Sequence, residues 1–96
     1  MPEPPFQEFD RAREAGRYFE AHEIMEKFWI GYRGADRDFY KGLIQTAAAL
    51  HHAARGNVAG AQVVGRRARA YLTPFAPGHA GVDVAALLAL LARCAA

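Results

Sequence analysis

Residues 18–29, with the sequence YFEAHEIMEKFW, constrain the fold most, because their apolar residues repeat with the period of an α-helix. One face of this helix collects a continuous apolar set: Tyr18, Ala21, Ile24, Met25, Phe28 and Tyr32. A second face holds a mixed set: Phe19, His22, Glu26, Trp29 and Ile30. Only Glu20 and Lys27, with Glu23 at the margin, remain for solvent. Because two faces are rich in apolar groups, we expect this helix to lie at the centre of an all-α fold.

Glycines, prolines and capping residues divide the rest of the chain into further helices. A short first helix has Pro5 in its first turn and ends at Gly16, and the central helix then opens at Arg17 and runs to about Trp29 or Tyr32. Asp36 is suited to cap a third helix over residues 37–55, and a Gly56-Asn57 turn leads into a fourth. Residues 73–81 form a connector before the last helix. The sequence predicts one domain over residues 1–96, a five-helix bundle of two helical hairpins plus a closing C-terminal helix.

The third and fourth helices differ in what they place on their inner faces. His51 falls within the apolar arc of the third helix, whereas His52 projects to the opposite side with Lys41 and Gln45. The inner face of the fourth helix carries several small residues, which allow a close approach to its neighbour. In the connector, we expect His79 to be a solvated loop residue.

Composition limits the function classes. The chain has 96 residues, 52% of them hydrophobic and 23% charged, and a single cysteine that cannot form an internal disulfide. It has no apolar span of membrane length and no signal peptide at its N-terminus, so we expect a cytoplasmic protein without a membrane anchor. Residues 39–96 hold six Lys and Arg against one acid, but their arginines are spread around a helix. A nucleic-acid partner is therefore not expected.

The last helix suggests an oligomer. Asp83 can cap it, and the sequence VAALLALLARC that follows has no charge before Arg93. Leucines at several positions cover more than one face. A helix that is apolar all round is central or covered by another chain. We therefore expect a homodimer that forms through this helix.

Ionisable residues in the central helix form the one candidate site. His22 and Glu26 are four residues apart, so their side chains lie one turn from each other and can share a proton or bind a cation. With Glu23 they give the order H-E-x-x-E, which resembles the zinc-protease pattern H-E-x-x-H. A third ligand for a divalent metal has to come from elsewhere, and our candidate is His51.

The same residues also fit purely structural roles. Glu23 precedes Lys27 by four residues, in the favourable orientation for a surface ion pair. A half-buried histidine bonded to a nearby carboxylate, as His22 and Glu26 can be, is a common way to satisfy polar groups inside a helical protein. The sequence leaves both interpretations open.

The form G-x-x-x-x-A occurs at Gly16 and again at Gly56, each time at the start of the second helix of a hairpin. This arrangement resembles the turn region of tetratricopeptide-type repeats, where a small residue lets the second helix pack closely. Two copies are too few for a solenoid.

Three segments carry a closer resemblance: GRYFEAHEIMEKFW at residues 16–29, FYKGLIQTAAALHH at residues 39–52 and RGNVAGA at residues 55–61. They resemble the domain of unknown function 309 family, which contains small all-helical prokaryotic proteins with no assigned activity. The resemblance implies the fold, and it carries the family's motif onto seven residues: His22, Glu23, Glu26, Trp29, Gly42, Gln45 and His51. The tail from residue 73 departs from this pattern.

Two hypotheses about function follow. The first is a helical module that binds a partner protein or a small ligand through a buried polar cluster, with these binding residues: His22, Glu26, Trp29, Gln45 and His51. The second is a metal-dependent hydrolase in which His22, Glu26 and His51 hold a divalent cation. In that case Glu23 acts as the general base on the metal-bound water.

Overall fold

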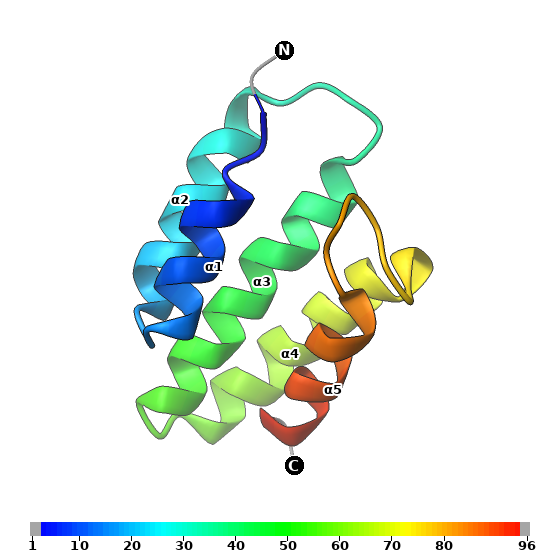
Figure 1. Ribbon diagram of the computed structural model, residues 1–96. Helices are drawn as coiled ribbons and strands as arrows, with labels where there is room; N and C mark the ends of the chain where they lie inside the picture. Colours follow the sequence, from blue (N-terminus) through cyan, green and yellow to red (C-terminus); the bar gives the residue numbers. More distant parts are fainter. Residues whose placement is uncertain (1–2, 95–96) are drawn as a thin grey trace.

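The computed structural model describes residues 3–94, which form five α-helices and one 3₁₀ turn (Figure 1). In chain order the elements are α1 (Phe6–Glu14), α2 (Tyr18–Gly31), α3 (Arg37–Ala54), α4 (Val58–Leu72), η1 (Thr73–Phe75) and α5 (Val84–Cys94). The pairs α1–α2 and α3–α4 form two helical hairpins, and α5 packs against α3 and α4. The predicted all-α architecture is therefore confirmed. Every helix in this part of the chain is too short or too polar to span a membrane.

Both hairpins turn in the same way, at Gly16 and Gly56, whose φ angles are +80° and +75°. In the first turn, the amide of Gly16 donates to Arg13 O, and the amide of Arg17 donates to Ala12 O. The corresponding two bonds close the second turn, so each helix ends in a Schellman motif that needs a left-handed glycine. The alanine that ends each G-x-x-x-x-A copy is buried. The sequence repeat therefore corresponds to a repeated structural unit.

The centre of the bundle is α3, not α2. Nine residues of α3 are buried: Phe39, Tyr40, Gly42, Leu43, Ile44, Thr46, Ala47, Ala49 and Leu50. The buried residues of α2 are only Ala21 and Met25, and Phe19 and Ile30 are 54% and 61% exposed. The prediction of a central α2 was wrong because its second face lies at the surface, whereas α3 contacts α2, α4 and α5.

Small residues bring α3 and α4 close together. A Cβ atom on Gly42 would lie 2.6 Å from Cδ2 of Leu72 and 3.1 Å from Cβ of Tyr71. Further along the pair, a Cβ on Gly65 would lie 4.0 Å from Cβ of Ala49. The predicted close approach through the small residues of α4 is confirmed, and Gly42 is the matching position on α3.

Side-chain caps begin α4 and α5, as predicted. Oδ1 of Asn57 and Oδ1 of Asp83 each accept a hydrogen bond of 3.0 Å from the backbone amide three residues further on. Asp36 occupies the N-cap position of α3, but its side chain makes no capping hydrogen bond. The predicted capping chemistry of Asp36 was therefore wrong, because its carboxylate is directed to His79, with Oδ2 3.0 Å from Nε2.

The connector between α4 and α5 folds back onto the core. Ala80 and Gly81 have φ angles of +52° and +80°. The residues on either side of them, His79 and Val82, exchange two backbone hydrogen bonds of 3.1 and 2.8 Å. This tight turn holds the imidazole of His79 against the ring of Phe39, with ring centroids 4.7 Å apart. His79 is therefore a packed residue, and the expectation of a solvated loop histidine was wrong.

Most leucines of the last helix are covered within its own chain, and Leu90 is half-buried. Val84, Leu87 and Leu91 of α5 are buried, and Leu88 packs against the same core. The outward positions of α5 include four exposed alanines: Ala85, Ala86, Ala89 and Ala92. Three of the four leucines of α5 are therefore covered by the chain itself. The homodimer stays a prediction.

Candidate functional site

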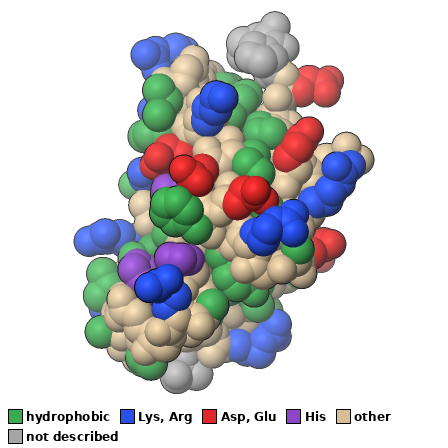
Figure 2. All heavy atoms as spheres, turned by 90° about the vertical axis from the view of Figure 1, so that its left-hand side faces the viewer, with side chains coloured by type: hydrophobic (Ala, Val, Ile, Leu, Met, Phe, Trp, Pro, Cys, Tyr) green, Lys and Arg blue, Asp and Glu red, His purple; other side chains and the backbone are tan. Residues whose placement is uncertain are grey.

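Two predicted site residues, His22 and His51, meet at the seam between α2 and α3. They line a hollow of about 340 Å³, whose walls we call the histidine shelf: Phe19, His22, Ala48, His51 and His52. Figure 2 shows this face of the molecule, on which histidine side chains gather around hydrophobic groups and carboxylates lie beside them. The side chain of Ala48 is small, and this leaves room between the larger rings.

Phe19 links the histidines of the two helices. The centroid of its ring lies 5.8 Å from that of His22, in a stacked arrangement, and 5.5 Å from that of His51. His22 and His51 were expected to lie close together, and in the structure both rings contact the ring of Phe19. The expected burial of Phe19 on the second face of α2 was wrong, since this side chain is 54% exposed.

The pair His22 and Glu26 is half-buried. Nε2 of His22 is 3.6 Å from Oε2 of Glu26, and the two side chains are 24% and 41% exposed. Nδ1 of His22 is buried and has no hydrogen-bond partner. The predicted spacing of one helical turn is correct, but the expected burial of the cluster was wrong because α2 covers the core with only one face.

His52 lies on the same side as His51, with ring centroids 6.1 Å apart. Its Nδ1 is 3.1 Å from Nδ2 of Asn57, which makes this ring nitrogen the acceptor and links the shelf to the α3–α4 turn. Gln45 lines a different hollow of about 660 Å³, between α3 and α4, together with Asp38 and Tyr71. Gln45 and His52, seven residues apart, share a side of α3 as predicted, but His52 also lines the histidine shelf, so the prediction that it projects away from His51 was wrong.

The predicted metal ligands are not assembled in this structure. Across residues 3–94, the structure has no group of three or more His, Cys, Asp or Glu side chains that could hold a metal ion. The set of His22, Glu26 and His51 therefore does not provide the three ligands that a catalytic zinc site needs. Glu23 is exposed and lines no part of the hollow, so its position does not support a role as general base. Within this described part, Glu23 and Lys27 do not form the expected ion pair either.

Trp29 has a structural role at the other end of α2. Its Nε1 donates to Arg37 O (3.1 Å), and Nη1 of Arg37 donates back to Trp29 O (3.0 Å). The guanidinium of Arg37 and the ammonium of Lys41 lie 4.2 and 4.5 Å from the centroid of the indole ring. These hydrogen bonds and cation–π contacts fasten the end of α2 to the start of α3. Trp29 is thus separate from the histidine shelf.

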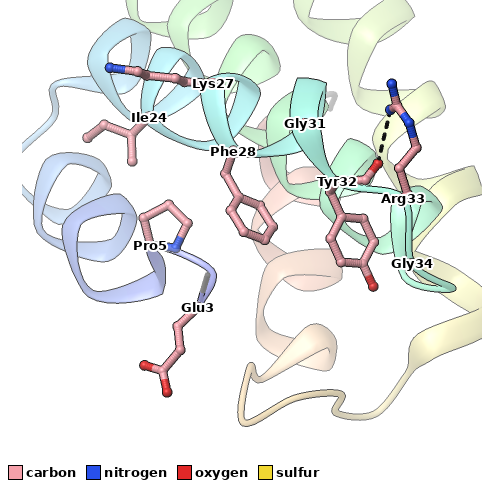
Figure 3. A pocket seen from close by; sticks show the side chains of 9 residues that line it. All are labelled: Glu3, Pro5, Ile24, Lys27, Phe28, Gly31, Tyr32, Arg33 and Gly34. Carbon is pink, nitrogen blue, oxygen red and sulfur yellow. Dashed lines mark hydrogen bonds between the residues drawn. The ribbon is translucent and has the colours of Figure 1, made fainter. Parts of the chain in front are cut away.

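A larger hollow lies where α2 extends beyond α1, and we call it the α2 groove (Figure 3). It has a volume of about 830 Å³. Its apolar walls come from Ile24 and Phe28 of α2, from Tyr32 directly after this helix and from Pro5 of the segment before α1. In Figure 3, the rings of Phe28 and Tyr32 point into the space beside this segment. Lys27, Arg33 and Glu3 also line the groove.

The sequence contained a signal for this groove. The helix α1 has 9 residues and α2 has 14, and the two run antiparallel, so α1 cannot cover the last turns of α2. At about 1.5 Å of rise per residue, the difference amounts to more than one helical turn. The helical period places Ile24, Phe28 and Tyr32 on the core face, and they are covered there only where a neighbouring helix reaches them.

Tyr40 forms the aromatic layer behind the groove. Its ring lies 5.1 Å from that of Phe28 and 4.8 Å from that of Tyr32, both in edge-to-face contact. Burial, followed by the nearby Tyr32 and Asp36, raises the pKa of the Tyr40 hydroxyl above its usual value. Tyr40 therefore remains neutral over the ordinary pH range.

Comparison with known proteins shows which family contains this site. The family model described as "Domain of unknown function (DUF309)" matches residues 6–64, which is more than half of the 96-residue chain. The chain belongs to the DUF309 family. The match covers α1, α2, α3 and the first half of α4, so every residue of the histidine shelf lies within the DUF309 region. The recognised resemblance is thus confirmed.

A relative of this DUF309 chain has no assigned role. The chain is similar to the uncharacterized protein YpuF of Bacillus subtilis (strain 168), with 46% identity over 46 residues. This match covers 47% of the DUF309 chain and 26% of YpuF, so it spans about a quarter of the relative. No solved structure matches. Family membership therefore assigns no function to the chain, and only the geometry of the site bears on it.

Proposed function

We propose that this DUF309 chain is a helical binding module that docks a partner protein through the histidine shelf. The observation that supports this best is Phe19, which is 54% exposed and lies beside a hollow of about 340 Å³. Exposed aromatic side chains next to small hollows are typical of the energetic centres of protein interfaces. The partner places an apolar side chain in the hollow, against the rings of His22 and His51.

Charges on α2 indicate the chemistry of the partner. Glu23 is exposed and Glu26 is 41% exposed, and both lie on the helix that carries Phe19. The only cation within α2 is Lys27. A partner segment with basic residues around an apolar anchor complements this surface, and such charge pairs act mainly on specificity and association rate.

The metal-dependent hydrolase has no comparable support. It requires three ligands around one ion, whereas the side chains of His22 and His51 both pack on Phe19. It also requires a base directed at the ion, whereas Glu23 faces solvent. We therefore propose binding alone as the function.

A matched pair of variants tests the proposal. Phe19→Ser removes the exposed ring of the shelf, and Ile30→Ser removes an apolar side chain of similar exposure, 61%, at the other end of α2. Proteins captured from cells by the wild-type chain and by both variants are compared quantitatively. A partner of the shelf is retained by wild type and by Ile30→Ser and is lost by Phe19→Ser.

The purified partner then provides the decisive measurement. We expect Phe19→Ser to weaken its binding by a factor of about 10 or more, which is the effect of removing an interface anchor. Ile30→Ser should change the affinity by less than about twofold, since it lies outside the hollow. Circular dichroism and thermal unfolding of both variants verify the fold. Equal affinity of wild type and Phe19→Ser would overturn the proposal.

A further inference from the structure

The α2 groove combines an apolar lining with cationic side chains. Its volume of about 830 Å³ falls within the range of about 300–1,000 Å³ that is typical of small-molecule sites. In Figure 3, Lys27 lies toward the Ile24 side of the groove and Arg33 beside Gly34, and the charged groups of both are at the rim, directed away from the rings of Phe28 and Tyr32. Neither side chain forms an ion pair with a carboxylate of residues 3–94. The groove thus offers apolar contact along its length and two cationic side chains at its rim, Lys27 and Arg33.

We propose that the α2 groove binds an amphipathic anion, a molecule with an apolar chain and a carboxylate head. The chain lies against the rings of Phe28 and Tyr32 and the ring of Pro5. The carboxylate is held by Lys27 or Arg33 at the rim of the groove. This site is separate from the histidine shelf, so it does not rest on the proposed partner binding.

The helix end next to the groove does not oppose an anion. The last turn of a helix carries a partial negative charge on its free carbonyls. Here Arg33 donates to Ile30 O and Tyr32 O, and Arg37 donates to Trp29 O. These guanidinium groups offset the negative end of α2.

The balance of side chains around the groove also favours an anion over a cation. Glu3 is the one carboxylate among the residues that line it, and it stands against the two cations Lys27 and Arg33. An amine head would meet repulsion from both Lys27 and Arg33, whereas a carboxylate meets it only near Glu3. The charge of the head group is therefore the property that distinguishes ligands.

Three ligands of equal chain length test this inference: octanoate, octanol and octylamine. Each is titrated into the isotope-labelled full chain, and the backbone amide resonances are followed by NMR. We expect octanoate to bind most tightly and octylamine most weakly, with the largest shifts at residues that line the groove. Equal binding of octanoate and octylamine would overturn the role of the cations. Shifts centred on the histidine shelf would overturn the location.

Two variants separate the apolar from the charged part of the site. Gly31 lines the groove, and a Cβ atom there meets no other atom within 4 Å, so Gly31→Leu adds an apolar side chain at the groove wall with no contact at its Cβ. We expect this variant to lower the affinity for octanoate and the affinity for octanol equally, by about tenfold. The double variant Lys27→Gln/Arg33→Gln should lower octanoate affinity to that of octanol and leave octanol unchanged. Ile30→Leu, next to the groove, is the matched control and should bind as wild type does.

The variants also define failure. Wild-type affinity for octanoate in Gly31→Leu would show that the ligand lies elsewhere. An undiminished preference for octanoate in the double variant would show that other groups select the anion. If the wild-type chain binds none of the three ligands, the proposal is wrong.

Discussion

The carboxylate of Asp36 meets the imidazole of His79 at 3.0 Å, and this contact joins the α2–α3 loop to the connector before α5. Both side chains are about one-third exposed. Despite this short distance, Nε2 of His79 makes no aligned hydrogen bond within residues 3–94. The ring of His79 also packs on Phe39 and Phe75, with centroids 4.7 and 4.8 Å apart. His79 thus anchors the connector mainly through ring packing.

Removing the ring should therefore cost more stability than removing the charge. We expect His79→Ala to lower the free energy of unfolding by about 1–2 kcal/mol, because it loses two aromatic contacts. Asp36→Asn should lower it by less than about 1 kcal/mol, since partly exposed ion pairs contribute little. Urea unfolding measures both, with the exposed Asp38→Asn as a control. If His79→Ala has the same free energy of unfolding as wild type, this residue does not anchor the connector.

Gly42 should be intolerant of even one added methyl group. Its Cβ would lie 2.6 Å from Cδ2 of Leu72, so Gly42→Ala must push α4 away from α3 or move this side chain. We expect a loss of about 1–3 kcal/mol in the free energy of unfolding. Gly31→Ala is the control, since its Cβ meets no atom within 4 Å, and it should gain up to about 1 kcal/mol from helix propensity. Equal stability of the two variants would contradict close packing at Gly42.

Turn chemistry was the most predictable part of this fold. Gly16 and Gly56 end helices in left-handed conformations, and Asn57 and Asp83 cap the helices that follow them. These interactions are local, so the residue types alone specify them. The helical periods then gave two hairpins and a closing helix, because each apolar stripe has to be covered.

What the sequence could not provide is which neighbour covers each stripe. His22 and His51 were correctly expected at one place, but a helical period cannot show that α3, and not α2, has neighbours on several sides. Burial of Phe19 was therefore overestimated. The α2 groove was missed for a related reason, since it depends on the difference in length between α1 and α2. Long-range packing, and not local propensity, decided these positions.

Tyr40 should make the stability of the chain fall at alkaline pH. Because its pKa is raised in the folded state, the unfolded chain releases this proton first, at the usual tyrosine pKa of about 10. Its contribution is fully present below about pH 10 and is lost as pH rises through the folded-state pKa. The other tyrosines and the lysines also ionise there, so the difference between wild type and Tyr40→Phe isolates the effect. Urea unfolding is measured from about pH 8 to about pH 11.5, which brackets the usual tyrosine pKa of about 10. The free energy of unfolding should fall more steeply with pH for wild type than for Tyr40→Phe.

His22→Ala should fold and remain nearly as stable as wild type. Glu26 is 41% exposed, so its carboxylate is hydrated by solvent once the imidazole is removed. We expect a loss of less than about 1 kcal/mol in the free energy of unfolding. Met25→Ala, which truncates a fully buried neighbour, should cost about 2–5 kcal/mol and provides the scale. A loss of several kcal/mol for His22→Ala would instead mark the cluster as part of the core.

The homodimer through α5 is the prediction with the simplest measurement. The exposed Ala85, Ala89 and Ala92 follow one another at helical spacing, and such a stripe lets two helices approach closely. Light scattering at micromolar concentration should then give twice the 10.5 kDa mass of the chain. Ala89→Glu should shift the protein to monomer by placing a charge in the interface. Ala59→Glu, at an exposed position of α4, is the control that should remain dimeric. A monodisperse wild-type monomer would show that the alanine face of α5 is simply exposed to water.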